Sequence, residues 1–330
     1  MRRLLAVVVL LALMGAFAFG VNRFLASRRS HIPSESTISA PTETRTAVTL
    51  PGTMFISQHG DIYALAGGYF SDLRLARSGT WMQPSVIPGS DAILAVLRTD
   101  AFSDVYMIDA GGGAVHKLSH NATPGKVIQL NHWMFWPRVG ADAQTVYMSY
   151  DSPKTQESYQ IDFAVWQGTL AGKLAVHQVT DPFGYTGGDV DAVPLAGGGI
   201  LYSKYQISSG QVYSRLAVQK DALAEPVYLT TATDDCGQPA LSPDGASLAM
   251  VCTGGTGLQS TRLEVASLSG TTLGKPRTLI NNCLCAAPAW APDGSGLAYY
   301  APADAGGHFQ LWWIAGAAGA TPHAAQEVTS

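Results

Sequence analysis

Charged side chains are scarce in this chain of 330 residues. Asp, Glu, Lys and Arg together make up 13% of it, and the formal net charge is −4. Proteins that bind nucleic acid usually carry a basic patch or stripe, and the overall charge offers none. A nucleic-acid partner is therefore not expected. The 35 glycines, with no long charged helical face beyond the N-terminal region, are instead typical of many short strands joined by turns.

Motifs for hydrolytic and metal chemistry are missing as well. The sequence contains no Gly-x-Ser-x-Gly, and no His-x-x-x-His or His-Glu-x-x-His on a plausible helix. The first pattern places a serine nucleophile on a strand-to-helix turn, and the other two place a pair of metal ligands on one helix face. We therefore expect no catalytic residues, no bound metal and no cofactor.

Cysteine is absent before Cys236, which argues against a lipid-modified cysteine as an N-terminal anchor. An apolar run covers residues 4–20 and has arginines on both sides, which is sufficient for a single membrane span. We expect residues 1–29 to form a transmembrane anchor that places the rest of the chain outside the cytoplasm, in the periplasm or the extracellular space. A signal peptide cleaved near Ala18 and a cytosolic chain are the alternatives. Residues 30–46 are rich in Ser, Thr and Pro and predict a disordered linker, which leaves residues 47–330 for the folded domain.

A proline-anchored unit recurs along that domain. Its clearest copies begin at Pro239 and Pro288. In each copy, Pro-Asp-Gly begins four residues after that proline, and an apolar residue stands nine positions after it. Pro84 and Pro137 anchor two further copies, and Asp191 stands in the anchor position of a degenerate one. Successive anchors lie 48 to 54 residues apart. A repeat of this period predicts a tandem-repeat fold, because one unit cannot bury its own core.

Four strands are expected in each unit. The second strands are 92–97, 145–149, 199–203, 247–252 and 296–300; the third strands include 104–109, 160–165, 211–216 and 310–314; the fourth strands include 115–119, 176–180, 227–230 and 326–330. An earlier, compressed unit has a strand–turn–strand at 47–56, a third strand at 60–65 and a fourth at 72–75. Six such units arranged radially make an all-β, six-bladed propeller, with an irregular β-sandwich as the alternative.

The Pro-Asp-Gly units between residues 236 and 314 resemble the TolB-type, WD-repeat-like β-propeller family, whose blades also occur in the propeller domains of some peptidases. The resemblance implies a six-bladed propeller that is commonly periplasmic or extracellular and serves protein–protein contact. TolB itself has a separate N-terminal α/β domain where this chain has an anchor and a linker. Its own role in the cell envelope is therefore not carried over.

The four cysteines, Cys236, Cys252, Cys283 and Cys285, all lie late in the chain. Cys236 and Cys285 occupy the same repeat position, and a hairpin centred on Asp244 places Cys236 opposite Cys252. We expect the four to gather at one end of two adjacent blades and to form two disulfides. Of the three possible connectivities, Cys236–Cys285 with Cys252–Cys283 is favoured because it avoids a short Cys283–Cys285 link. Free thiols and a four-thiolate zinc site are the alternatives.

Two groups of side chains at the beginnings of inner strands are candidates for ligand binding. Trp133 and Trp136 would form a stacking surface for a sugar or a peptide, although packing between blades explains them equally well. Four carboxylates would bind a cation or a polar ligand, or would cap turns, which is the favoured interpretation. They are Asp189, Asp191, Asp234 and Asp235.

Taken together, these features predict a membrane-tethered propeller that acts as a non-catalytic binding or scaffold module for an unknown protein partner in the cell envelope. Two other functions stay open. One is a propeller-type lyase or glycosidase that uses Asp and His side chains in the central channel. The other is a sensor of glycans or small molecules that uses the tryptophans.

Overall fold

The computed structural model describes residues 48–76, 78–111, 113–123, 125, 127–151, 162–253, 261–303 and 307–329. The expected anchor at 1–29 and the linker at 30–46 lie outside these residues. Within the described ranges, no helix combines the length and the apolar character that a membrane span requires.

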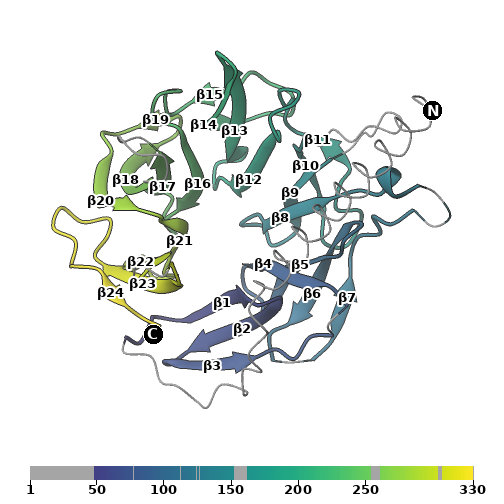
Figure 1. Ribbon diagram of the computed structural model, residues 1–330, viewed down its shortest axis with the longest axis horizontal. Helices are drawn as coiled ribbons and strands as arrows, with labels where there is room; N and C mark the ends of the chain where they lie inside the picture. The colour runs from purple at the N-terminus through teal and green to yellow at the C-terminus, as the bar shows by residue number, and fades with distance from the viewer. Residues whose placement is uncertain are drawn as a thin grey trace, which may run out of the picture. The chain divides into compact units, whose positions relative to one another are not determined.

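The strands of the described residues form six sheets, arranged as blades around a centre (Figure 1). Each blade is continuous in sequence, and its first strand is the innermost one. Blade 1 holds β1 (Thr53–Gln58), β2 (Asp61–Ala66) and β3 (Tyr69–Asp72). Blade 2 holds β4 (Thr80–Val86), β5 (Ala92–Arg98), β6 (Ser103–Asp109) and β7 (Val115–Lys117). Blade 3 holds β8 (Met134–Val139), β9 (Thr145–Tyr150), β10 (Ala164–Thr169) and β11 (His177–Gln178), and a short 3-10 helix, Ile128–Leu130, precedes it.

The later blades follow the same order. Blade 4 holds β12 (Asp189–Pro194), β13 (Ile200–Ser208), β14 (Gln211–Gln219) and β15 (Val227–Tyr228). Blade 5 holds β16 (Cys236–Leu241), β17 (Ser247–Thr253), β18 (Thr261–Ser269), the short β19 (Thr272–Leu273) and β20 (Arg277–Cys283), which also pairs with β18. Blade 6 holds β21 (Ala286–Trp290), β22 (Gly296–Pro302), β23 (Phe309–Ala315) and β24 (Gln326–Glu327). The prediction of an all-β, six-bladed propeller is confirmed.

The anchor prolines lie in a β-bulge of each inner strand. In blades 2 to 6 the register of the inner strand against its neighbour shifts at one equivalent place. The first residue of each bulge has positive φ; these residues are Gln83, Trp136, Asp191, Gln238 and Ala287. The second residue is the anchor proline in four blades, where its missing N–H suits a bulge.

The register corrects the prediction for blade 4. Asp191 occupies the position before the proline, and Ala192 takes the proline's own place. The reason is the turn that leads to Ile200, which is one residue shorter than the corresponding turns of the other blades. Counting back nine residues from Ile200 therefore reaches one residue too far.

A hydroxyl at the end of the fourth strand explains the Thr or Ser that recurs there. In four blades this hydroxyl accepts a hydrogen bond of 2.9 Å from a third-strand amide. The pairs are Ser119 with Val105, Thr180 with Val165, Thr230 with Leu216 and Thr329 with Leu311. The bond satisfies an amide that the short fourth strand has stopped pairing.

The ring closes through side-chain packing between blade 1 and blade 6. Leu50, Ile56 and Leu65 share a buried apolar cluster with Leu311 and Val328. Gly52 has positive φ and approaches the ring of Pro292 so closely that a Cβ would lie 3.0 Å from it. In the described part of the chain, residues 48–50 form no strand and no sheet mixes strands of the two blades. The strand that was expected to begin at residue 47 is therefore not seen in residues 48–50.

Candidate functional site

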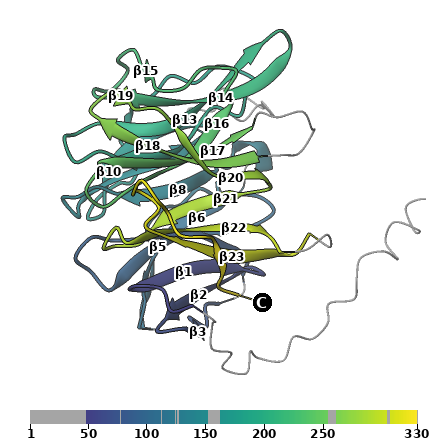
Figure 2. The ribbon, with the colours of Figure 1, turned by 90° about the vertical axis from the view of Figure 1, so that its left-hand side faces the viewer.

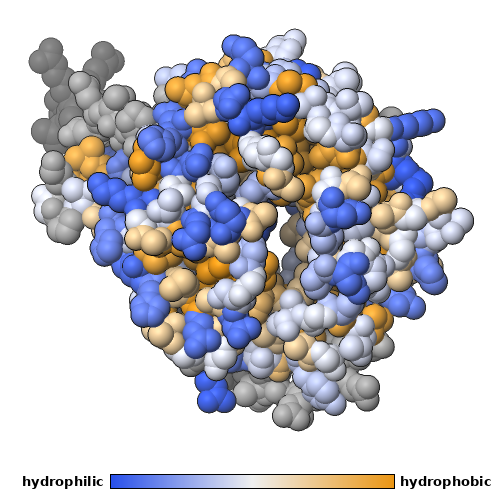
Figure 3. All heavy atoms as spheres, turned by 180° about the vertical axis from the view of Figure 1, so that it is seen from behind, coloured by the Kyte–Doolittle hydropathy of each residue, from blue (hydrophilic) through white to orange (hydrophobic). Residues whose placement is uncertain are grey.

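Several candidate residues lie at one face of the ring, where the inner strands begin, and Trp136 and Asp191 lie at the bulges of the same strands. We call this the N face, and the opposite side, where the inner strands end, the C face. Trp133 and Asp235 immediately precede inner strands, and Asp189 and Cys236 are the first residues of theirs. The space-filling view from behind Figure 1 shows an opening near the centre of the ring (Figure 3). The N face and this opening are therefore the surfaces to examine for a site.

Four half-buried aromatic rings form an aromatic cluster on the N face of blade 3: Trp133, Phe135, Trp136 and Phe163. The Trp133 and Phe135 rings stack with their centroids 6.1 Å apart. The Phe135 ring also lies 5.7 Å from Trp136 and 5.7 Å from Phe163, both edge to face. Phe135 is thus the centre of the cluster, and the two predicted tryptophans meet through it.

Hydrogen bonds fix the backbone beneath the aromatic cluster. The amide of Trp133 donates to Asp151 Oδ1 at 2.9 Å. Trp136 has positive φ because it begins the bulge, and its amide donates to Gln83 Oε1 of blade 2 at 2.8 Å. The rings are therefore presented from a rigid strand, which lowers the entropic cost of binding.

The loop before β12 extends this apolar surface. Both carboxylate oxygens of Asp162 accept backbone amides of the loop, from Tyr185, Thr186 and Gly187, at 2.9 to 3.1 Å. This holds the loop next to Phe163, which forms a parallel bridge with Gly188. The loop presents Tyr185, whose side chain is 79% exposed, and Phe183, which is 49% exposed. Sequence reasoning missed Phe163 and this loop because their partners lie in other parts of the chain.

Asp189 is held in a buried ion pair with Lys204, directly opposite it on β13. Lys204 Nζ lies 3.1 Å from both carboxylate oxygens and also donates to the carbonyl of Asp181 at 2.7 Å. Burial raises the pKa of the Asp189 carboxyl to about 6, although Lys204 opposes this shift. Both side chains are buried, so the pair ties the loop before β12 to the strand rather than reaching solvent.

The other three carboxylates are also engaged. Asp191 accepts a hydrogen bond of 3.2 Å from Arg138 of blade 3, and burial raises its pKa. Asp234 accepts from the amide and the hydroxyl of Thr231, and these bonds lower its pKa. Asp235 accepts from the amide and hydroxyl of one serine and from one threonine hydroxyl; its partners are Ser214 and Thr253. Asp234 holds a turn, which is the role favoured from the sequence, whereas the other three carboxylates each join elements that are separate in the chain.

The cysteines form two disulfides with a pairing that corrects the prediction. Cys236 is bonded to Cys252, and Cys283 is bonded to Cys285. The expected placement of Cys236 opposite Cys252 is confirmed by the register of β16 and β17, and their Cα atoms lie 4.0 Å apart. Cys283 ends β20 and the chain turns before β21, so the Cα atoms of Cys283 and Cys285 are 5.2 Å apart and a bond fits.

One set of possible metal donors lies close together in the described ranges. The ligand atoms of Cys236, Cys252 and Glu264 are within 4.8 Å of one another. Because the two sulfurs are bonded to each other, they are not thiolate ligands in this state.

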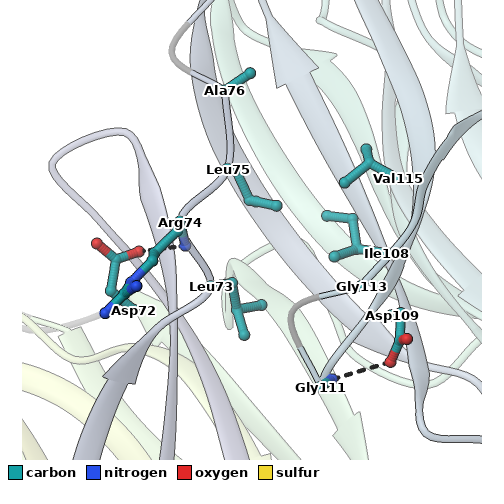
Figure 4. Close-up of a pocket in the computed structure, with 10 residues that line it drawn as sticks. All are labelled: Asp72, Leu73, Arg74, Leu75, Ala76, Ile108, Asp109, Gly111, Gly113 and Val115. Carbon is teal, nitrogen blue, oxygen red and sulfur yellow. Dashed lines mark hydrogen bonds between the residues drawn. The ribbon is translucent and has the colours of Figure 1, made fainter.

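Two surface pockets lie away from the aromatic cluster. One of about 380 Å³ lies between blades 1 and 2. Figure 4 shows that its two carboxylates, Asp72 and Asp109, accept hydrogen bonds from the backbone amides of Arg74 and Gly111. Each carboxylate therefore stabilises the turn that follows it. The other, of about 450 Å³, lies beside Cys283, and none of its described lining residues is charged.

Comparison with known proteins agrees with the fold. No protein-family model matches the chain, and no curated protein sequence does. The chain is similar to the structure of a protein described as TolB from Agrobacterium tumefaciens, with a TM-score of 0.56 and 12% identity, over 77% of this chain and 88% of that one. It is similar to puromycin hydrolase, with a TM-score of 0.52 and 19% identity, but it spans only 39% of that enzyme's length. A gluconolactonase from Xanthomonas campestris matches with a TM-score of 0.51 and 10% identity, over 89% of this chain and 90% of that one. Identities this low establish the propeller fold alone.

Proposed function

We propose that this chain is a non-catalytic protein-binding module of the TolB-like propeller type, and that the N face of blades 3 and 4 is its binding surface. The observation that carries the proposal is the aromatic cluster with the neighbouring loop, where half-buried rings and the exposed Tyr185 are held on a hydrogen-bonded backbone. Trp and Tyr side chains dominate the energetics of protein interfaces.

The hairpin of β13 and β14 adds to this surface. Its strands have nine residues each, whereas β9 and β10, the corresponding strands of blade 3, have six each. Figure 2 shows the hairpin at the upper right. Ile207 and Val212 lie opposite each other near its tip and are about half exposed. An exposed apolar pair on a projecting hairpin, beside a set of rings, suits a protein partner better than a small molecule.

The carboxylates give less support to an enzyme. A lyase or glycosidase in the channel needs an acid and a base that are free to reach a substrate. Asp189 and Asp191 are paired with Lys204 and Arg138, and Asp234 and Asp235 are engaged by hydroxyl and amide groups. A binding role requires no change in any of these contacts.

The proposed location is outside the cytoplasm, on a membrane anchor formed by residues 1–29. The apolar run at 4–20 supports an anchor, and the disulfides Cys236–Cys252 and Cys283–Cys285 support an oxidising compartment, since such bonds are rare in reducing cytosol.

The proposal is tested by a crosslinking pull-down from intact membranes with the full-length chain. We expect a specific partner to be recovered with the wild type and with Val176→Ala, which changes an exposed apolar residue on the C face. The double variant Trp133→Ala, Tyr185→Ala should recover at least about tenfold less, as expected when interface anchors are lost. Equal recovery by this variant would mean that the partner binds elsewhere.

Glycan binding is a second candidate, because the stacked, half-buried Trp133 and Phe135 rings offer a face on which a sugar ring packs. A glycan panel screened by tryptophan fluorescence distinguishes the two functions. Saturable quenching that is lost in Trp133→Ala would establish a glycan site, and a lack of response across the panel would leave the protein partner as the function.

A further inference from the structure

Among the described residues, blade 1 has no counterpart of the inner strand that the other blades have. The amide of Leu73 donates to the carbonyl of Ile62 at 3.1 Å, just as Leu118 donates to Val105 in blade 2 at 2.9 Å. This equivalence makes β2 the third strand of its blade, as the sequence predicted, and β3 the fourth, which ends at Asp72 where the fourth strand was expected to begin. β1 is therefore a second strand, and Figure 1 shows it on the inner side of its sheet. No described segment pairs with the inner edge of β1.

The register shows which backbone groups face this open edge. Ser57 lies opposite Ile62, and in blade 2 Val96 lies opposite Val105, so Ser57 corresponds to Val96. In blade 2, alternate residues of β5 face the inner strand, since Ala92 accepts the amide of Ile87 at 3.3 Å. The corresponding residues of β1 are Thr53, Phe55 and Ser57. Their amides and carbonyls point towards the missing strand, while those of Met54, Ile56 and Gln58 pair with β2.

The open edge also interrupts a chain of contacts around the channel. The amide of Trp136 donates to Gln83 Oε1 at 2.8 Å, and the amide of Ala287 donates to Gln238 Oε1 at 2.6 Å. Each bond joins the bulge of one inner strand to the bulge of the previous blade. Between Ala287 of blade 6 and Gln83 of blade 2 the described chain has no inner strand to continue this interface.

We propose that the inner edge of β1 binds an extended segment of the partner protein, which adds to blade 1 as its inner strand. This inference rests on the proposed function and names its binding mode. Unpaired backbone groups along one edge are satisfied by an extended polypeptide, through β-strand addition. A sugar or a metal ion does not offer alternating donors and acceptors at strand spacing.

The chain's own inner strands define the chemistry of that segment. Four of them have a buried apolar or sulfur-containing residue three positions before the anchor proline, at or next to the start of the strand: Trp81, Met134, Cys236 and Cys285. A proline follows at the bulge, and two positions later comes an apolar residue: Val86, Val139, Leu241 or Trp290. The segment that fits blade 1 is therefore an extended peptide of the pattern apolar-x-x-Pro-x-apolar. In the register of blade 2, its last apolar residue lies opposite the half-buried Met54 of β1 and its first lies opposite Gln58.

The test uses the full-length protein and a capped peptide with the sequence of residues 80–86, Thr-Trp-Met-Gln-Pro-Ser-Val, followed by fluorescence anisotropy. A scrambled peptide of the same composition is the control ligand. Ser57 is exposed and its amide faces the open edge, so Ser57→Pro removes one donor without breaking the pairing with β2. Ser57→Ala keeps the amide and is the matched control. We expect wild type and Ser57→Ala to bind alike, and Ser57→Pro to bind about tenfold more weakly.

Amide hydrogen exchange provides a readout that needs no variant. The amides of Phe55 and Ser57 should exchange rapidly in the free protein and slow down with the peptide, while those of Met54 and Ile56 stay protected throughout. No saturable binding by the wild type, or equal binding by Ser57→Pro, would overturn the inference. Protection of Phe55 and Ser57 in the free full-length chain would overturn it too, because the edge would then be closed by the chain itself.

The two proposals fail separately. If the wild type does not bind the peptide, the pull-down that compares it with Trp133→Ala, Tyr185→Ala still tests the proposed function, because these two residues lie in blades 3 and 4. Conversely, a pull-down that recovers no partner refutes the proposed function even where the peptide occupies β1.

Discussion

Replacing Lys204 by Met tests how the N face of blade 4 is held together. The change leaves the Asp189 carboxylate buried and without its cation, and it also removes the bond to the carbonyl of Asp181. Breaking a buried ion pair from one side costs about 3 to 5 kcal/mol, because the remaining charge is uncompensated. We expect the free energy of unfolding at pH 7 to fall by that amount.

The pH dependence gives this prediction its sign. The folded-state pKa of Asp189 is about 6, above the value of about 3.9 for an unfolded aspartate. The folded protein therefore holds this proton more tightly, so the contribution of Asp189 to stability falls as the pH rises from about 4 to 6, by about 3 kcal/mol in total. Below pH 6 the carboxyl is largely neutral, and the loss caused by Lys204→Met should be smaller at pH 5 than at pH 7.

Urea unfolding at both pH values measures these losses, provided that the m-value is unchanged. Lys220→Met is the matched control, because Lys220 is exposed on the same blade. A loss below about 1 kcal/mol at pH 7, or an equal loss at both pH values, would contradict the account of a charged, buried pair.

Three further variants test the scaffold. Replacing both Cys236 and Cys252 by serine should lower the free energy of unfolding by about 3 kcal/mol, because their bond closes a loop with a sequence separation of 16. An unchanged urea midpoint would contradict this prediction. Gly188→Ala should lower the free energy of unfolding by about 1 to 3 kcal/mol more than Gly187→Ala, measured by thermal or urea unfolding. Both glycines have φ near 90°, but only at Gly188 would a Cβ overlap the backbone of Phe163, just before β10. Thr180→Val should cost about 1 to 3 kcal/mol, since it leaves a buried amide without its acceptor; a loss equal to that of an exposed Thr→Val change would refute this role.

The sequence predicts the ring well because its signals are local and repeated. Pro239 and Pro288 mark the bulges of their inner strands. Because each repeat of about 50 residues forms one blade, the number of repeats in the sequence predicts the number of blades. Asp191 was placed one residue off because one turn is shorter, and no residue within the turn signals a missing position.

The site depends on contacts that no local pattern carries. Trp133 and Trp136 were identified from their clustering in sequence, but Phe163 joins them only through the fold. The disulfide pairing was predicted wrongly because Cys283 and Cys285 were judged too close in sequence to bond. The chain turns between β20 and β21 and holds their Cα atoms 5.2 Å apart, a distance that a disulfide spans.

Site-specific photocrosslinking on intact membranes tests the central claim most directly. A photoreactive residue at Tyr185, which is 79% exposed on the N face, is compared with one at Val176, which is 47% exposed on the C face. The account predicts one specific protein adduct from position 185 and none from position 176. An adduct from position 176 alone would place the binding surface on the other side of the propeller and contradict it.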